Sequence, residues 1–413
     1  MRVPYFDYTY VNRPTSKYIT PQMLSTKRAK KEIREINMNM NNKDYAREYV
    51  ETRGLSETTL QKITLILEHY STYQNKTIHE LLQEADHEED QGIRWKRRTL
   101  KTRLTQYMNY LKKEMLLSSA KTYLNTIHSF YLHHEIEIGT LPKWNLKNAN
   151  IPEPITSKDM LTKHIIREAL KIANNTLRPI ILLEASSGMT RSDVLNLTIG
   201  QFIEATHPYH NTNNIPEAIE KMLTQDNIIP AFHLRRSKTN KYFITFCSPE
   251  ATIEICKYLR LRNKRNKKYH RPLLTDVDKL FKIHQGTYID KFNEINNSLN
   301  CGKTGTYNQF RGHMLRKFHA TQLEKYGMSR ALVNVLQGKS NNAVDDVYFL
   351  EDEQTLREEY IKALEGVLIY TDVKEITKYS IEYQKLEEEN KKFREREEKL
   401  MEIFERLEKL ENS

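Results

Sequence analysis

The segment from Gly312 to Tyr348 constrains this chain more than any other part of its sequence. It opens with His-Met-Leu-Arg, in which His313 and Arg316 are three residues apart and share one face if the segment is helical. A helix-like run then leads to Lys339, and Tyr348 stands nine residues after Lys339 and 32 residues after Arg316. Taken alone, the His-x-x-Arg pair is more typical of a basic surface helix that carries a hydrogen-bonded histidine. The added lysine and tyrosine favour a functional grouping.

In order and spacing, this stretch resembles the second conserved box of the tyrosine recombinases, the phage-integrase family, which reads H-x-x-R, then L-G-H or a variant, then a tyrosine nine residues later. The resemblance implies that Tyr348 is the nucleophile, because a phenol forms a reversible phosphotyrosyl ester that keeps the energy of the broken bond. Arg316, His313 and Lys339 would then stabilise the charged phosphorus. Many relatives carry histidine or tryptophan where Lys339 stands, so we expect hydrogen-bond donation from it, and no proton shuttling.

A second motif, Ser-Gly-Met-Thr-Arg-Ser-Asp from Ser187 onward, resembles the family's first box, G-[LM]-R-x-[ST]-E-x-x-x-L. Aligned without gaps, Thr190 falls where the family has arginine, and Asp193 replaces the usual glutamate. The resemblance assigns the second catalytic guanidinium to Arg191 by a shift of one residue, which would turn a side chain by about 100° on an ideal helix. We therefore expect Arg191 at or before the first helical turn, aimed at the pocket of the second box. The alternative is a surface arginine at a helix start.

The run from His233 to Phe246 predicts two short strands around a polar turn. It resembles the family's β-hairpin, in which a lysine just before a threonine reaches into the minor groove and protonates the departing 5′ oxygen. Lys238 fits that place, with Lys241 as the alternative, because an ammonium is both an electrostatic partner and a proton donor.

A strongly basic stretch lies in the first half of the chain, where residues 93–121 hold nine Lys/Arg and one Glu. Charge of a single sign predicts contact with DNA phosphates, whereas a solvated helix face is the alternative. The candidate DNA-binding residues are Arg94, Lys96, Arg97, Arg98, Lys101, Arg103 and Lys121.

The chain divides by composition into five parts. Residues 1–54 form a basic arm, with eleven basic and six acidic residues, and residues 56–147 have a helical pattern that resembles the family's DNA-clamping, core-binding domain. Two prolines mark residues 148–156 as a linker. Residues 157–370 would be the catalytic domain, with helices over 157–173, 178–186 and 356–370, the last of which docks on a neighbouring protomer in this family.

Residues 372–413 carry a net charge of −3, which leaves +14 on the rest of the chain. Leu386, Phe393, Leu400 and Leu407 follow one another at intervals of seven, which favours a coiled coil and a dimer, although a single charged helix is the alternative.

Bulk composition agrees with an enzyme that acts on DNA. The net charge of +11 favours a polyanionic partner, here double-stranded DNA. Three cysteines without ligand spacing indicate neither a disulfide framework nor a zinc site, and no apolar run is long enough for a membrane span. We expect a cytoplasmic, nucleoid-associated protein without a metal or nucleotide cofactor.

Together these features predict a mainly α protein, with a helical core-binding domain, an α-rich catalytic domain holding a small β-hairpin, and a C-terminal long helix or coiled coil. The resemblance implies site-specific recombination, meaning integration or excision, by a tetramer on synaptic DNA through a 3′-phosphotyrosyl intermediate. A type IB topoisomerase that relaxes DNA alone, and a DNA-binding relative without catalysis, remain as alternatives.

Overall fold

The computed structural model describes residues 40–147, 149–236, 240–339 and 353–370. The chain forms two compact units, Met1–Glu153 and Pro154–Ser413, and their junction falls inside the predicted linker. In the described ranges, helices prevail over two small two-stranded sheets, so the prediction of a mainly α fold is confirmed. None of these described helices is long and apolar enough to cross a bilayer.

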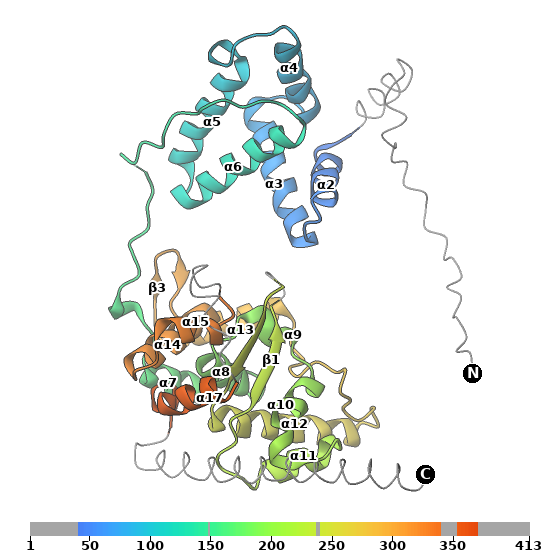
Figure 1. The fold of residues 1–413 in the computed structure, drawn as a ribbon, viewed down its shortest axis with the longest axis vertical. Helices are drawn as coiled ribbons and strands as arrows, with labels where there is room; N and C mark the ends of the chain where they lie inside the picture. Colours follow the sequence, from blue (N-terminus) through green and yellow to red (C-terminus); the bar gives the residue numbers. More distant parts are fainter. Residues whose placement is uncertain (1–39, 148, 237–239, 340–352, 371–413) are drawn as a thin grey trace, which may run out of the picture. The chain divides into compact units, whose positions relative to one another are not determined.

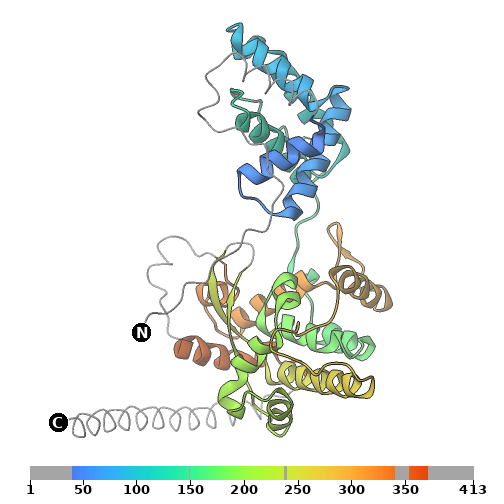
Figure 2. The same cartoon turned by 90° about the vertical axis from the view of Figure 1, so that its right-hand side faces the viewer.

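The first unit is a bundle of helices with its own core (Figures 1 and 2). Its elements are α2 (Asn42–Thr52), α3 (Glu57–Gln74), α4 (Ile78–Asp90), the 3-10 turn η2 (Trp95–Arg97), α5 (Thr99–Glu114) and α6 (Leu117–His133). Ser56, the first residue of the predicted helical pattern, is the N-cap of α3, and the apolar face of this helix is buried, including Ile66, Leu67 and Tyr70. Helix α4 was not separately predicted.

Helix α2 corrects the boundary of the basic arm. Asn41 caps this helix, and Tyr45, Ala46, Tyr49 and Val50 are buried in the core of the first unit. Residues 42–52 therefore belong to the helical unit and not to the arm, because α2 packs its apolar face on α3. Residues 1–39 lie outside the described part of the chain.

The second unit surrounds the central helix α8 (Leu177–Ser187), in which every residue except Arg178 is buried. Helix α14 (Gly312–Lys325) and α12 (Pro249–Lys268) pack on α8. Further helices of this unit are α7 (Lys163–Ile172), α9 (Arg191–Asn196), α10 (Ile199–His210), α11 (Ile215–Met222), α13 (Gln285–Ser298) and α15 (Arg330–Leu336). The helix predicted over 157–173 is in fact a 3-10 turn, η3 (Ser157–Asp159), followed by α7, since Thr162 caps a new helix.

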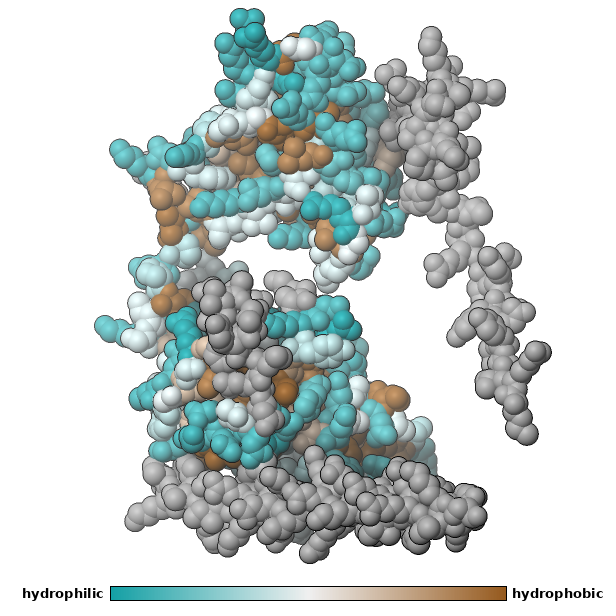
Figure 3. All heavy atoms as spheres, viewed as in Figure 1, coloured by the Kyte–Doolittle hydropathy of each residue, from teal (hydrophilic) through white to brown (hydrophobic). Residues whose placement is uncertain are grey.

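The predicted hairpin is present as β1 (Ala231–Arg235) and β2 (Tyr242–Phe246), which pair antiparallel with Arg235 opposite Tyr242. Strand β1 packs on α10, and β2 packs on α8 and α15. A second, shorter pair, β3 (Lys303–Thr304) and β4 (Tyr307–Asn308), precedes α14. On the face drawn in Figure 3, hydrophilic residues (teal) cover more of the described surface of both units than apolar residues (brown) do.

The prediction of one helix over 356–370 is wrong, because the structure has two shorter helices there, α17 (Glu353–Lys362) and α18 (Leu364–Val367). The chain turns at Ala363, and α18 packs on α14 so closely that a Cβ on Gly366 would lie 3.0 Å from the carbonyl oxygen of Gln322. Their apolar side chains, among them Leu356 and Leu364, are buried within the same chain. Docking on a neighbouring protomer stays a prediction, and the predicted coiled coil lies outside the described residues.

Candidate active site

Arg316 lies in the second turn of α14, as the sequence predicts, with its side chain buried. Its Nη1 donates a hydrogen bond to the carbonyl oxygen of Gly188, and its Nη2 donates one to the carbonyl oxygen of Gln337 at 2.7 Å. Burial and the nearby cation Arg236 lower the pKa of Arg316 to about 10, whereas Asp193 opposes the shift. The guanidinium therefore stays charged at neutral pH. Its hydrogen bonds connect Gly188 of the first box with Gln337, which lies two residues before Lys339 of the second box.

Gly188 in the first box is required by close packing. It ends α8 with a φ of +64°, and a Cβ at this position would lie 2.5 Å from Nδ1 of His319 and 2.9 Å from Nε2 of Gln337. These two side chains contact each other at 3.0 Å, and Gln337 also donates to the carbonyl oxygen of Arg316. Burial lowers the pKa of His319 to about 3, so this imidazole is a neutral part of the scaffold.

Three of the predicted catalytic residues, His313, Arg316 and Lys339, line one cavity of about 360 Å³. Its other charged lining residues are Lys317, Arg330 and Glu324. Positive groups outnumber the single carboxylate, so the cavity suits an anion such as a phosphodiester.

The cations of this cavity affect one another's proton affinity. Burial lowers the pKa of His313, and the neighbouring charges, Lys317 first, lower it further. Burial and then Arg316 likewise lower the pKa of Lys339. Because the pKa of His313 is lowered from its ordinary value of 6.5, the imidazole is neutral at pH 7, and its ring can donate one hydrogen bond and accept another.

Arg191 is the first residue of α9, which confirms its expected place in the first helical turn. The preceding Thr190 caps this helix, since its hydroxyl accepts a hydrogen bond from the amide of Asp193 and donates one to Oδ2 of Asp193 at 2.6 Å. Arg191 does not line the cavity of Arg316, as far as the described residues define that cavity. Its positive charge acts instead on the buried Glu184. The catalytic role of Arg191 therefore stays a prediction.

Glu184 is a fully buried carboxyl group that sequence analysis did not single out. The Tyr288 hydroxyl donates to it, at 2.8 Å from Oε1 and 2.7 Å from Oε2. Burial raises the pKa of Glu184 to about 8, while the Tyr288 hydrogen bond and Arg191 pull it down. Gly312, at the start of α14, packs against this pair, because a Cβ there would lie 2.2 Å from the Tyr288 hydroxyl oxygen. No local pattern in the sequence marks such a group.

The hairpin supplies another cation that sequence analysis missed. Nη1 of Arg236, just after β1, donates to the carbonyl oxygen of Gly338 at 2.9 Å, next to Lys339. Two main-chain hydrogen bonds connect the residues that follow β1 with those that precede β2. The amide of Arg236 donates to the carbonyl of Lys241, and the amide of Asn240 donates to the carbonyl of Arg236. Lys238 itself lies outside the described residues.

Tyr348 also lies outside the described residues, so the nucleophile remains a prediction from spacing. Tyr360, which follows Tyr348 by twelve residues, could not replace it as the nucleophile. It is fully buried, its hydroxyl donates to the carbonyl oxygen of Ser186 at 2.8 Å, and burial raises its pKa well above the ordinary value. A phenol held in this way is neither accessible nor readily ionised.

The structure divides the candidate DNA-binding cluster of the first unit. Arg98 is buried and donates to Glu89 at 2.6 Å, and Arg103 donates to both carboxylate oxygens of Glu84, at 2.7 and 3.1 Å. Both guanidinium groups thus form ion pairs within the first unit. These ion pairs account for the positive charges of Arg98 and Arg103 without a contact to DNA phosphate. Of the remaining candidates, Lys101 is partly exposed and the other four are exposed, namely Arg94, Lys96, Arg97 and Lys121.

Neither a protein-family model nor a curated protein matches this sequence. Among solved structures, the chain is similar to the XerA recombinase, with 17% identity over 77% of this chain and 96% of that one and a TM-score of 0.31. It is also similar to the Tn1549 transposon integrase in complex with transposon right end DNA, with 13% identity, coverage of 79% and 100%, and a TM-score of 0.45. The XerH site-specific recombinase bound to its difH substrate has 14% identity, coverage of 82% and 90%, and a TM-score of 0.44. Because values at this level do not establish function, the site residues have to carry the proposal.

Proposed function

We infer that this chain is a site-specific DNA recombinase of the tyrosine type, which integrates or excises a mobile element. The observation that carries the proposal is the cationic cavity lined by His313, Arg316 and Lys339. Arg316 is anchored there to Gly188 of the first box and to Gln337. The spacing of Tyr348 from Arg316 and Lys339 assigns the role of nucleophile to Tyr348.

In the proposed reaction, the Tyr348 phenol gives its proton to a water molecule, and its oxygen attacks the scissile phosphorus of double-stranded DNA. The bond from phosphorus to the 5′ oxygen breaks, Lys238 gives a proton to that oxygen, and a 3′-phosphotyrosyl ester remains. Arg316, His313 and Lys339 stabilise the charge on the non-bridging oxygens, with Arg191 as the second guanidinium. Attack by the 5′ hydroxyl of another strand reverses the step and releases the enzyme.

The partners follow from this reaction. Strand exchange needs two duplexes and four active sites, so we propose a tetramer on synaptic DNA. The exposed basic residues around Lys96 and Arg97 would contact the DNA backbone. Each step uses protein side chains, so the proposal requires neither a metal nor a nucleotide.

A DNA-binding protein without catalysis is the second candidate. It is favoured by Thr190, which stands at the family's arginine position and is used for helix capping. It is also favoured by the position of Arg191, which does not line the described cavity. Such a protein would bind DNA and leave it intact.

A suicide substrate separates the two candidates. A duplex nicked near the cleavage point, made from DNA that flanks the gene, should become covalently attached to the protein, because the short cleaved fragment diffuses away. Tyr348→Phe should bind the duplex with near-normal affinity and form no adduct, while Tyr326→Phe should form it normally. Binding without an adduct for the native chain would overturn the recombinase proposal.

A further inference from the structure

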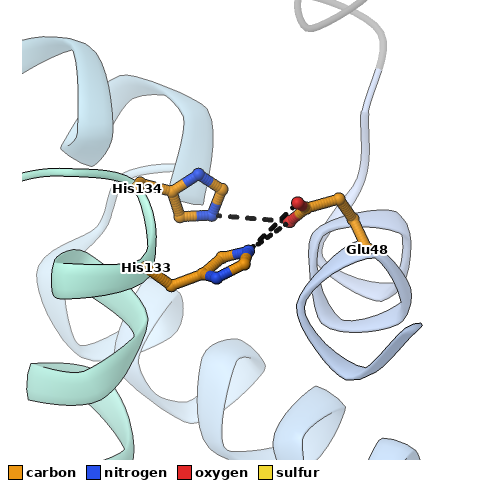
Figure 4. Close-up of side chains that lie close together, drawn as sticks. All are labelled: Glu48, His133 and His134. Atoms are coloured by element: carbon orange, nitrogen blue, oxygen red, sulfur yellow. Dashed lines mark hydrogen bonds and ion pairs between the residues drawn. The ribbon is translucent and has the colours of Figure 1, made fainter. Parts of the chain in front are cut away.

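Two histidines and a glutamate meet in the first unit, and none of the three is among the residues proposed to act on DNA (Figure 4). Glu48 comes from α2, whereas His133 ends α6 and His134 follows it as the C-cap. The Nε2 atom of His133 lies 3.0 Å from Oε1 of Glu48, and Nε2 of His134 lies 3.8 Å from Oε2. All three groups thus turn one donor atom toward a common point.

These separations suit a zinc ion. Zinc binds imidazole nitrogen and carboxylate oxygen at roughly 2.0–2.2 Å, so two donors of a tetrahedral site are about 3.3 Å apart. The donor atoms of Glu48, His133 and His134 lie within 4.8 Å of one another. Small rotations of the side chains would therefore close the site, without movement of either helix.

Aromatic packing holds both imidazoles in place. The His134 ring contacts Phe130 edge-on, at 4.6 Å between ring centroids, and the His133 ring contacts Tyr49 in the same way at 5.0 Å. The Tyr49 hydroxyl is in turn 2.9 Å from the hydroxyl of Ser129, which ties α2 to α6. Ligands held by their neighbours lose little freedom when a metal binds.

His134 also has an unused donor atom. Its Nε2 is buried and has no hydrogen-bond partner among the described residues, a state that costs free energy unless a ligand is present. For His133, a change of tautomer would move the proton to Nδ1 and free Nε2 for the metal.

A cavity of about 650 Å³ adjoins this cluster and is lined by both Glu48 and His134. Other imidazole and carboxylate side chains line the same cavity, namely His79, His87, Asp86 and Asp90. The cavity provides an entry path and room for a water molecule as a fourth ligand.

We propose that Glu48, His133 and His134 bind one zinc ion, which clamps α2 to the end of α6. Two nitrogens and one carboxylate form a ligand set typical of zinc, whereas magnesium prefers oxygen ligands alone. The competing interpretation is an ion pair between Glu48 and His133 that stabilises the unit without metal. Zinc dependence distinguishes the two.

The test uses the untagged full chain after treatment with a chelator and dialysis, because a histidine tag would itself bind zinc. Calorimetric titration with Zn²⁺ should give one saturable site, and the melting temperature should rise with zinc concentration and not with Mg²⁺. His134→Gln should weaken zinc binding by at least about 100-fold. His128→Gln, which removes a histidine elsewhere on α6, should leave zinc binding unchanged.

Glu48→Gln is the second variant, and it decides the matter if His134→Gln fails to fold. The amide oxygen still accepts a hydrogen bond from His133, so the fold is kept, whereas loss of the negative charge should weaken zinc binding by at least about 10-fold. The chain has 14 histidines, so some background binding is expected. Equal zinc affinity in the native chain and in Glu48→Gln, or no saturable site in the native chain, would overturn the proposal.

Discussion

The side chain of Arg316 donates a hydrogen bond to the main-chain carbonyl of Gln337 at 2.7 Å, two residues before Lys339. The same guanidinium donates to the carbonyl of Gly188. It thus holds the end of α8 and the segment after α15 together in the candidate site. A residue that would contact phosphate therefore also holds the protein together.

Arg316→Lys should lower both cleavage and stability. A lysine keeps the charge, but its single ammonium cannot reach both carbonyls in the geometry of the guanidinium fork. One buried carbonyl left unpaired costs about 1–3 kcal/mol in the free energy of unfolding. Urea denaturation measures this loss, with Lys317→Ala on the same helix as a control that should cost under about 0.5 kcal/mol. An unchanged unfolding free energy for Arg316→Lys would exclude the bracing role.

Lys238→Ala should cleave ordinary DNA slowly and recover on a substrate with a 5′-phosphorothiolate bridge. Sulfur leaves without protonation, so the missing general acid no longer matters. Single-turnover cleavage rates on both substrates measure the recovery. Equal slowness of Lys238→Ala on the two substrates would leave only a positioning role, and recovery of Lys241→Ala in its place would transfer the role to Lys241.

The exposed and the buried residues of the basic cluster should behave differently. Removal of the charges at Lys96 and Arg97 should weaken binding to all DNA sequences. It should also reduce the slope of log binding constant against log salt concentration by up to about 0.9 for each lost phosphate contact. Arg98→Ala should keep the salt slope and cost about 3 kcal/mol of stability, because it leaves Glu89 without its buried partner. Affinity measured at several salt concentrations, with urea denaturation, tests both. A salt slope that only Arg98→Ala flattens would reverse this assignment.

Glu184 should make the unfolding free energy depend on pH. Its folded pKa of about 8 lies above its ordinary value of 4.5, so the protonated carboxyl favours the folded state. This contribution is complete below about pH 4.5 and is lost as the pH rises toward 8. Glu184→Gln stays neutral throughout and should therefore gain stability relative to the native chain between pH 5 and 8, by on the order of 3–5 kcal/mol. Denaturation at three pH values measures the gain, with the exposed Glu294→Gln as control, and a constant difference across that range would contradict the shift.

Sequence patterns predicted those parts of the fold that depend on neighbours along the chain. The start of α3 at Ser56, the helix that carries His313 and Arg316, and the strands on either side of Lys238 follow from capping residues and from periods of 3.6 and 2. The break at Ala363 and the membership of α2 in the first unit could not be predicted, because both depend on which surfaces are covered by distant segments.

By itself, the sequence determined which chemical groups are available and at what spacing, including Tyr348, Lys238 and the two boxes. Only the tertiary structure decided what several of those groups do. Arg316 meets a carbonyl 128 residues away, and His133 meets Glu48 across 85 residues. Burial and hydrogen bonding between such distant residues determine whether a charge braces the fold or faces a ligand, and no local pattern encodes them.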